Sequence, residues 1–452
     1  MSVARTQHSP SVATGTAHVL ALSIARYLLG FVSSAIVTRA LGPAGRGAYY
    51  LPILAAATAT TIGKLGIDQA NVFLYGTSGI SEQRLAAQNG LIAFGCGVFL
   101  GALMPLLPVI APGTFGETSL LWLLIAAATI PIGLHSLLAG SLFALVGRVR
   151  RQYVAAVAGG VVQVVMAVVL FVSGRMTVTA ALVLALTGSF VTWAVIAAPL
   201  LADPAAWIRW DWPLLKTTLR SALVLHLGMT LFFLHLRVDM FMVDAWLGAA
   251  PLGQYSIAVT LAETLMLAAD AVAVAVLPGQ MTNTVADAAA RALRAARVNA
   301  LLGVALAVTA AVVSGPAIRL VYGAAYDPAV WPMIILLPGV VFMGMQRVCG
   351  APALRAGRPE RFAAIYGSTL ALNIVLNVFW IPRYGITGAS FASTVSYAVG
   401  SMMFLLWTTR IARMPLSQAV RFDAADRAAA FDAARSMVAL ARGLISPARE
   451  PL

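Results

Sequence analysis

Long apolar runs separated by short polar stretches dominate this chain. A transmembrane helix needs about 20 mostly apolar residues to cross roughly 30 Å of hydrocarbon, and twelve segments of the chain qualify. Six lie in the first half, at 17–40, 49–75, 86–111, 119–145, 153–173 and 178–201. Six lie in the second half, at 219–246, 254–278, 298–321, 331–349, 362–381 and 387–409. We therefore expect an all-α polytopic membrane protein with 12 transmembrane helices.

Repeated motifs divide these spans into two related halves. Leu41–Tyr49 (LGPAGRGAY) shares the frame L-G-x(4)-G-x-Y with Leu247–Tyr255 (LGAAPLGQY), 206 residues later, and we expect each copy to be a tight turn outside the membrane. A second shared frame, G-x(6)-GR-x-x-R, begins at Gly140 and again at Gly350. A nearly constant offset indicates internal duplication. The spans should form two pseudo-symmetric six-helix bundles, related by an axis along the membrane normal.

The spans and the basic residues predict domain limits and orientation. The expected parts are a cytoplasmic N-terminal segment (1–16), an N-terminal bundle (17–202), a cytoplasmic linker (203–218), a C-terminal bundle (219–409) and a cytoplasmic tail (410–452). With the N-terminus inside, 22 Lys and Arg residues fall on the cytoplasmic side and five on the other side. Basic loops stay in the cytoplasm. We expect a multi-pass protein of the cell inner (plasma) membrane with both termini cytoplasmic.

Composition excludes several classes of function. Hydrophobic residues make up 60% of the chain and charged residues 10%, whereas a soluble domain has about 25% charged residues. The net charge of +14 does not indicate a nucleic-acid partner, because the arginines flank the spans and no basic patch is interleaved with aromatic residues. The sequence contains no HExxH, GxxxxGK[ST] or GxSxG motif and no credible cluster of metal ligands. We expect no catalytic residues, metal or cofactor, and no enzyme activity.

Ionisable residues within the spans are the main functional candidates. The basic ones are Arg26, Lys64 and Arg237, and the acidic ones are Asp68, Asp239, Asp244, Glu263 and Asp270. Inserting a charged side chain at bilayer depth costs at least about 2.5–3.5 kcal/mol. Each of these side chains must therefore face protein or water. The alternative to a functional role is a structural ion pair inside a bundle.

Spacing narrows the pairing of these charges. Lys64 and Asp68 are four residues apart and share a helix face, so pairing with each other is one alternative. The repeat offset makes Lys64 and Asp270 equivalent positions, and both should face the interface between the halves. A pair between Lys64 and Asp270 is therefore a second alternative. Arg26 has no acidic neighbour in its own span, which favours a functional role. Its planar guanidinium could bind phosphate with two hydrogen bonds.

The motifs resemble those of a known family. The stretch Val37–Ile53 (VTRALGPAGRGAYYLPI), with Gly147–Tyr153 (GRVRRQY) and Gly357–Phe362 (GRPERF), is similar to the oligosaccharide flippases of O-antigen and other polysaccharide biosynthesis. These belong to the multidrug/oligosaccharidyl-lipid/polysaccharide exporter superfamily, and the resemblance covers about residues 16–410. It implies two bundles in a V shape, alternating access, and a cationic cavity for a lipid-diphosphate-linked glycan.

The resemblance also implies roles for individual residues. Arg26, Lys64 and Arg237 would hold the diphosphate of a lipid-linked oligosaccharide. Asp68, Glu263 or Asp270 would carry a coupling proton or sodium ion, and the remaining partners would be membrane lipids. The lipid II flippases of the superfamily typically have two further spans, which are not found here.

Two alternative functions stay open at this stage. A drug/cation antiporter of the same superfamily is one, although basic residues at the core suit a cationic substrate poorly. A membrane-embedded glycan polymerase or ligase is the other, although such enzymes usually carry catalytic residues in substantial loops, and the internal connections here are short.

Overall fold

The computed structural model describes residues 12–78, 80–201, 211–267, 269 and 284–445. Over these residues every regular element is a helix and no strand occurs. Nine helical segments of the described residues are long and apolar enough to cross a membrane. They are Ala21–Gly63, Glu82–Ile110, Leu120–Leu145, Val149–Val172, Val178–Ala198, Ala222–Leu247, Val285–Tyr322, Ala324–Gly350 and Pro359–Ala412. The expectation of an all-helical polytopic protein is thereby confirmed.

The helices follow one another with short connections. The first half contains α1 (Val12–Gly63), α2 (Ile67–Ser78), α3 (Glu82–Leu103), η1 (Met104–Leu106), α4 (Leu107–Ile110), α5 (Pro112–Phe115), α6 (Leu120–Leu145), α7 (Val149–Val172) and α8 (Val178–Leu201). The second half contains α9 (Trp212–His235), α10 (Val238–Leu247), α11 (Ala249–Glu263), α13 (Val285–Tyr322), η3 (Ala324–Ala329), α14 (Val330–Arg355) and α15 (Pro359–Ala412). The tail contains α16 (Leu416–Ala419) and α17 (Ala424–Ile445).

Nine segments replace the twelve expected spans for identifiable reasons. The helix α1 runs through the first expected span and into the second, and α15 contains the last two. Each of these long helices is broken at one glycine, Gly42 (φ 66°) in α1 and Gly385 (φ 61°) in α15. The expected span 254–278 begins in α11 and continues beyond Glu263 into residues that are partly outside the described set.

Each repeated LG motif contains the tight turn that the sequence predicts, made at one glycine between two helices. Gly42 (φ 66°, ψ 178°) and Gly248 (φ 86°, ψ −176°) share one backbone conformation, and a helix resumes at the next residue in both copies. A positive φ suits glycine because a Cβ would clash. Pro43 follows Gly42 directly, and proline is well accommodated in the first turn of a helix. One glycine therefore makes each bend.

Two expected spans are interrupted in the middle. Helices α1 and α2 are separated at Leu65 (φ 50°) and Gly66 (φ 73°), inside the expected span 49–75. Helices α9 and α10 are separated at Leu236 and Arg237, inside the expected span 219–246. In membrane transporters, substrate sites are typically formed by such discontinuous helices, whose free backbone groups face protein or water. Both breaks lie beside a basic candidate residue, Lys64 and Arg237.

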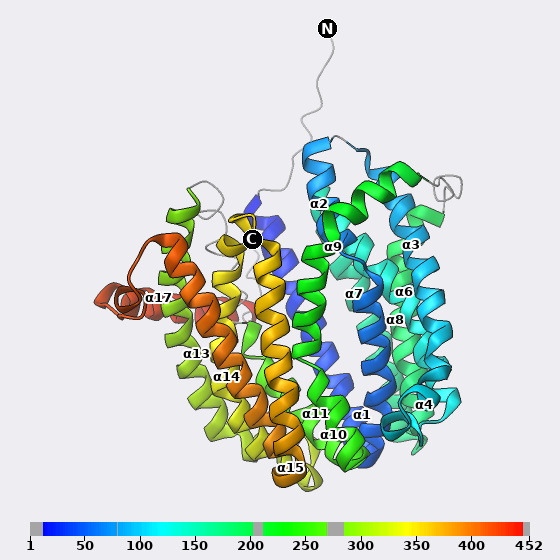
Figure 1. Ribbon diagram of the computed structural model, residues 1–452. Helices are drawn as coiled ribbons and strands as arrows, with labels where there is room; N and C mark the ends of the chain where they lie inside the picture. Colours follow the sequence, from blue (N-terminus) through cyan, green and yellow to red (C-terminus); the bar gives the residue numbers. More distant parts are fainter. Residues whose placement is uncertain (1–11, 79, 202–210, 268, 270–283, 446–452) are drawn as a thin grey trace, which may run out of the picture.

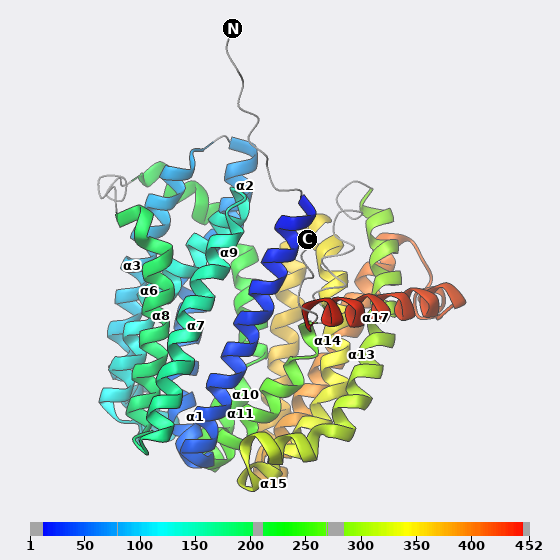
Figure 2. The same ribbon diagram turned by 180° about the vertical axis from the view of Figure 1, so that it is seen from behind.

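The helices gather in two groups. Figures 1 and 2 show α3, α6, α7 and α8 on one side and α13, α14 and α15 on the other. The α10 and α11 helices lie at the end of the molecule opposite the start of α1, which we call the far end (Figure 1). The α17 helix runs across the direction of the other helices (Figures 1 and 2).

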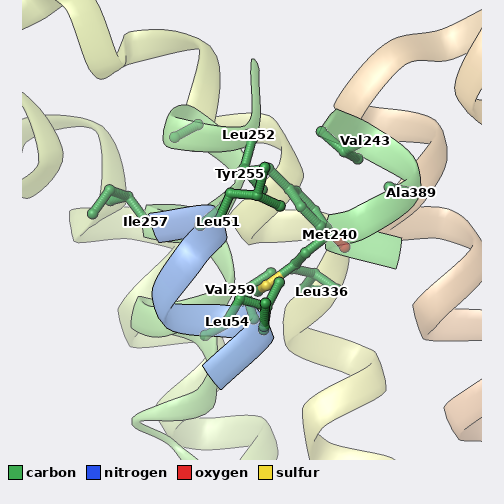
Figure 3. Close-up of a cluster of buried hydrophobic side chains, with 14 of the residues drawn as sticks. Leu51, Leu54, Met240, Val243, Leu252, Tyr255, Ile257, Val259, Leu336 and Ala389 are labelled. Atoms are coloured by element: carbon green, nitrogen blue, oxygen red, sulfur yellow. The ribbon is translucent and has the colours of Figure 1, made fainter. Parts of the chain in front are cut away.

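The largest apolar core connects the two halves. Leu51 and Leu54 from α1 lie against Met240 and Val243 from α10 and Tyr255 from α11 (Figure 3). Residues of α14 and α15 complete the cluster. Burial of apolar surface between halves holds them together at this level of the bundle.

Candidate functional site

Lys64 lies between α1 and α2 and is paired with the carboxylate one turn later. Its Nζ lies 3.1 Å from Oδ2 of Asp68, with side chains that are 17% and 23% exposed. Gln69 donates a second hydrogen bond to the same oxygen, at 3.0 Å. Of the two predicted alternatives, the structure contains the local pair. Asp270 lies outside the described residues, so the pairing of Lys64 with Asp270 stays a prediction.

Arg237 lies between α9 and α10 and forms a two-pronged ion pair with Glu263. Its Nη1 donates to Oε1 at 2.7 Å and its Nη2 donates to Oε2 at 2.8 Å. The side chains are 20% and 24% exposed. Parallel bonds of this kind are among the strongest that arginine makes. The sequence did not predict this pair, because its members come from separate helices and lie 26 positions apart.

Arg26 is the third basic candidate, and its surroundings differ. Its guanidinium carbon lies 4.4 Å from the ring centre of Tyr27 and 5.9 Å from that of Tyr153. Aromatic faces stabilise a cation without neutralising it. The buried Nε has no hydrogen-bond partner. Among the described residues no carboxylate lies within ion-pair distance of Arg26.

Arg26 also lines a cavity inside the first half. The cavity has a volume of about 250 Å³ and is lined by residues of α1, α6, α7 and α8. Polar side chains around it include Ser136, Gln163, Ser189 and Thr192, and its described lining contains no acidic residue. Glycines supply much of the remaining wall, which leaves room beside the guanidinium. A cation without a counter-charge in such a cavity suits an anionic ligand.

Asp239 is a functional candidate whose surroundings the sequence did not reveal. Its residue is 1% exposed, in α10. The carboxylate accepts hydrogen bonds from the Tyr255 hydroxyl at 2.5 Å, from the Ser393 hydroxyl at 2.8 Å and from the Met240 amide at 2.8 Å. A carboxylate at this depth needs a cation, or a proton, in addition to neutral donors.

A chain of polar side chains extends from Asp239 through the second half. Asn373 donates to the hydroxyls of Ser393 at 3.3 Å and Ser396 at 3.1 Å. Asn377 donates to Oδ1 of Asn373 at 2.8 Å, and its own buried Oδ1 has no hydrogen-bond partner. Asn373 and Asn377 are four residues apart and share a helix face, and through Ser393 this face is connected to Asp239.

The two LG motifs pack against each other in a reciprocal contact. A Cβ added to Gly47 would lie 1.8 Å from the Ala249 carbonyl oxygen. A Cβ added to Gly253 would lie 2.0 Å from the Pro43 carbonyl oxygen. Glycine is required at both positions because the backbones touch directly. Arg46, which we expected in an exposed turn, is 5% exposed, and its Nε donates to the Ser256 hydroxyl at 3.3 Å.

The described residues contain no group of three His, Cys, Asp or Glu side chains arranged to hold a metal ion. Of the charged residues expected within the spans, the structure describes one unpaired arginine, two ion pairs at helix breaks, and two carboxylates in α10, Asp239 and Asp244.

Comparisons with known proteins assign the family. Residues 36–331 match the family model described as "Polysaccharide biosynthesis protein". This match covers more than half of the chain, which therefore belongs to that family. The resemblance found in the sequence motifs is thereby confirmed. No curated protein sequence matches the chain.

Solved structures show the fold. A multidrug resistance MATE family transporter of the MOP superfamily, in an inward-facing conformation, is similar with a TM-score of 0.66 and 15% identity, over 89% of this chain and 99% of the transporter. The lipid II flippase MurJ, in an inward closed conformation, is similar with a TM-score of 0.64 and 15% identity, over 88% of this chain and 90% of MurJ. A MOP superfamily transporter from Pyrococcus furiosus is similar with a TM-score of 0.56 and 15% identity, over 90% of this chain and 96% of that transporter. The chain has the fold of this superfamily of membrane transporters.

Proposed function

We propose that this protein moves a polyprenyl-diphosphate-linked oligosaccharide from the inner to the outer leaflet for surface polysaccharide biosynthesis. The observation that carries the proposal is Arg26, a cation within the membrane-spanning part that lines a polar cavity without a carboxylate partner among the described residues. The positive charge of Arg26 repels a cationic substrate from this cavity. Family membership supports a polysaccharide precursor as the cargo.

Two structural relatives support the choice of a lipid-linked anionic cargo. MurJ is named as a lipid II flippase, and it shares the fold over most of both chains. The Pyrococcus furiosus transporter is described as having a binding pocket of reverse polarity that suggests a different function. An arginine-lined cavity within this chain is consistent with such a change of polarity. We propose that the polyprenyl tail stays in the lipid while the head group crosses through the protein.

The proposed architecture has 12 transmembrane helices in two six-helix bundles, 17–202 and 219–409. The bends at Gly42 and Gly385 would divide α1 and α15 into two spans each. The segment 1–16, the linker 203–218 and the tail 410–452 would lie in the cytoplasm, at the inner membrane. The described part of the linker begins at Asp211, whose side chain accepts the Leu214 amide at 3.0 Å and caps α9.

The diphosphate would bind first to Arg26 and then to the basic residues at the helix breaks. Lys64 and Arg237 are neutralised by Asp68 and Glu263 in this conformation, so the diphosphate must compete with the two carboxylates. A carboxylate that loses its basic partner inside the membrane requires a proton or a sodium ion. Cargo and ion would therefore change each other's affinity. Asp270 is the third proposed coupling residue.

Asp239 is a further candidate for the coupling ion or proton. Its carboxylate accepts from the Ser393 hydroxyl, and Ser393 is connected through Asn373 to Asn377, whose buried Oδ1 has no partner. Hard cations prefer oxygen ligands of this kind. The cluster lies on α10, α11 and α15, close to the junction of the two halves. Binding there would favour one relative position of the halves over another.

Alternating access would require the far end to open. The reciprocal contact between the two LG motifs closes that end in this conformation. If the N-terminus is cytoplasmic, the far end faces the outside, and the conformation described here blocks the outward route. Rocking of one bundle against the other would separate the motifs and release the glycan.

The proposal is tested by analysing polyprenyl-diphosphate glycans in lipid extracts of cells that lack this gene. Accumulation of complete repeat units on the inner leaflet, with loss of surface polysaccharide, is the expected result. Single units that reach the outer leaflet but stay unpolymerised would instead indicate a glycan polymerase or ligase. Unchanged glycans with altered drug sensitivity would indicate the antiporter.

A further inference from the structure

A second polar cavity lies at the far end, between the two halves. Its volume is about 370 Å³, within the range of small-molecule sites. The first half contributes residues of α1, α5 and the start of α6, and the second half contributes residues of α10 and α11. Figure 1 shows α10, α11 and α4 together at this end. None of the charged candidates identified at the helix breaks lines it.

Two tryptophans face this cavity, one from each half. Trp122 belongs to α6, and its indole Nε1 donates to the Thr179 hydroxyl at 2.9 Å, which fixes the orientation of the ring. Trp246 belongs to α10 and is 44% exposed. An indole combines a flat apolar face with a polar edge, and it loses little conformational entropy on binding.

Two carboxylates line the same cavity. Glu117 and Asp244 come from opposite halves, and neither forms an ion pair or hydrogen bond with a side chain in the part of the chain that the structure describes. Their oxygens are free to accept hydrogen bonds. The hydroxyls of Thr114 and Thr118 add groups that both donate and accept. The described lining of the cavity contains no Lys or Arg.

We infer that this cavity binds a sugar ring, either neutral or carrying an amino group. The apolar C–H face of a pyranose would stack on an indole, and its hydroxyls would donate to Glu117 and Asp244. A phosphate or an acidic sugar is excluded, because two unpaired carboxylates repel it. The inference rests on the proposed function, since it assigns the glycan of the cargo to this site and leaves the diphosphate at Arg26.

The placement gives the site a mechanistic consequence. Ala249 belongs to the cavity wall and also to the reciprocal contact that closes the far end. Because both halves form the cavity, it exists in this shape only while they are together. Sugar binding therefore stabilises the closed far end relative to the open one. The Arg26 guanidinium and the acidic cavity at the far end hold opposite parts of one cargo.

The test uses the full chain, purified in detergent micelles, on an array of neutral, amino and acidic oligosaccharides. We expect signals from neutral or amino sugars and none from acidic ones. The best-binding sugar is then titrated against the variants Trp246→Leu and Asp244→Asn, which should weaken binding about tenfold or more, as expected for loss of a stacking face or of a charged hydrogen-bond acceptor. Trp331→Leu is the matched control, since Trp331 is 69% exposed and lies outside the cavity.

The outcomes separate this site from the proposed function. Absence of sugar binding, equal binding of acidic sugars, or equal loss in Trp331→Leu overturns the site. The array measures free sugars and needs no transport. A chain that moves lipid-linked glycan across a membrane but shows no binding sensitive to Trp246→Leu therefore contradicts the sugar site alone. Sensitive binding in a chain that moves no cargo contradicts the flippase instead.

Discussion

Gly47 and Gly253 each lie against the backbone of the other's motif. Gly47 contacts Ala249, and Gly253 contacts Pro43. Gly253 is the repeat equivalent of Gly47, and Ala249 is the repeat equivalent of Pro43, each 206 residues later in the chain. A contact that repeats itself with its partners exchanged has the symmetry of a two-fold axis. The duplication seen in the sequence is therefore also a packing relationship, and the proposed axis between the halves passes through this junction.

Alanine at either glycine should prevent the far end from closing. Gly47→Ala or Gly253→Ala would bring a methyl group within 1.8 or 2.0 Å of a carbonyl oxygen, a clash that only separation of the motifs can relieve. We expect transport to fall about tenfold or more, because an overpacked closed state costs about 1–3 kcal/mol. Labelling of a cysteine at Ser256, which is buried here, should become faster in a background without Cys96 and Cys349.

Gly95→Ala is the control for this experiment. Gly95 lies in α3, and a Cβ added there would meet no atom within 4 Å. Transport and labelling should stay at the wild-type level in this variant. Unchanged labelling at Ser256 in Gly47→Ala would show that the motifs do not form the closing contact.

The pair of Arg237 and Glu263 should behave as a unit. Glu263→Gln alone leaves a cation at bilayer depth without its partner, which we expect to lower the free energy of unfolding by about 1–3 kcal/mol. The partial exposure of both side chains keeps this value below that of a fully buried pair. Arg237→Met combined with Glu263→Gln should restore part of the loss. Thermal unfolding in detergent measures the stability of the single and the double variant. If the two substitutions change the free energy of unfolding additively, the pairing is contradicted.

Asp239→Asn should uncouple transport from its driving ion. The substitution keeps the size of the side chain but removes the charge that needs a cation or proton in the Tyr255 and Ser393 cluster. Cargo movement in proteoliposomes should lose its dependence on an imposed proton or sodium gradient. Asp327→Asn is the control, because Asp327 forms an exposed pair with Arg319. Full gradient dependence in Asp239→Asn would exclude this residue from coupling.

The tail helix α17 should detach at low pH. Asp426 is buried at its start and pairs with Arg297 at 2.7 Å and Arg294 at 3.6 Å. Burial opposes ionisation of this carboxyl, but the hydrogen bond and charge of Arg297 outweigh it and hold its pKa below the usual value. A carboxyl whose pKa is lowered by folding stabilises the docked state at neutral pH, and protonation removes that stabilisation as the pH falls below about 4.

Limited proteolysis of α17 measures this effect. Cleavage should be slow at neutral pH and fast in acid, when an acid-active protease is used. Asp426→Asn should be cleaved quickly at both pH values, whereas Asp432→Asn should resemble the wild type because its side chain lies on the exposed face. Equal protection of Asp426→Asn at neutral pH would show that the pair does not hold the helix.

The sequence predicted features that depend on neighbours along one helix. Apolar runs predicted an all-helical polytopic protein, the repeat predicted equivalent turns in the two LG motifs, and the four-residue spacing allowed the pair of Lys64 and Asp68. Each of these follows from helix geometry alone. The breaks at Leu65 and Arg237 did not show in the pattern, because apolar residues continue across them.

Features that depend on the rotation of one helix against another were not predictable. Glu263 meets Arg237, and Asp239 meets Ser393, only after α10, α11 and α15 have packed. Apolar residues on all sides of a membrane helix give no amphipathic pattern from which its rotation could be read. The sequence could single out Arg26 as a residue without an acidic neighbour in its own span, but its cavity is lined by four helices, which the sequence did not predict.

Transbilayer movement of the cargo tests the central claim most directly. Proteoliposomes would contain the purified chain and a polyprenyl-diphosphate oligosaccharide that carries a fluorophore, and an impermeant reductant would report on label that reaches the outer leaflet. We predict that the wild type moves the label without a change in its mass, that Arg26→Lys keeps part of the rate, and that Arg26→Ala is slower by about tenfold or more, as expected for loss of a charge-assisted bond to phosphate. No movement by the wild type, equal rates for Arg26→Ala, or a newly formed glycosidic bond would contradict the account.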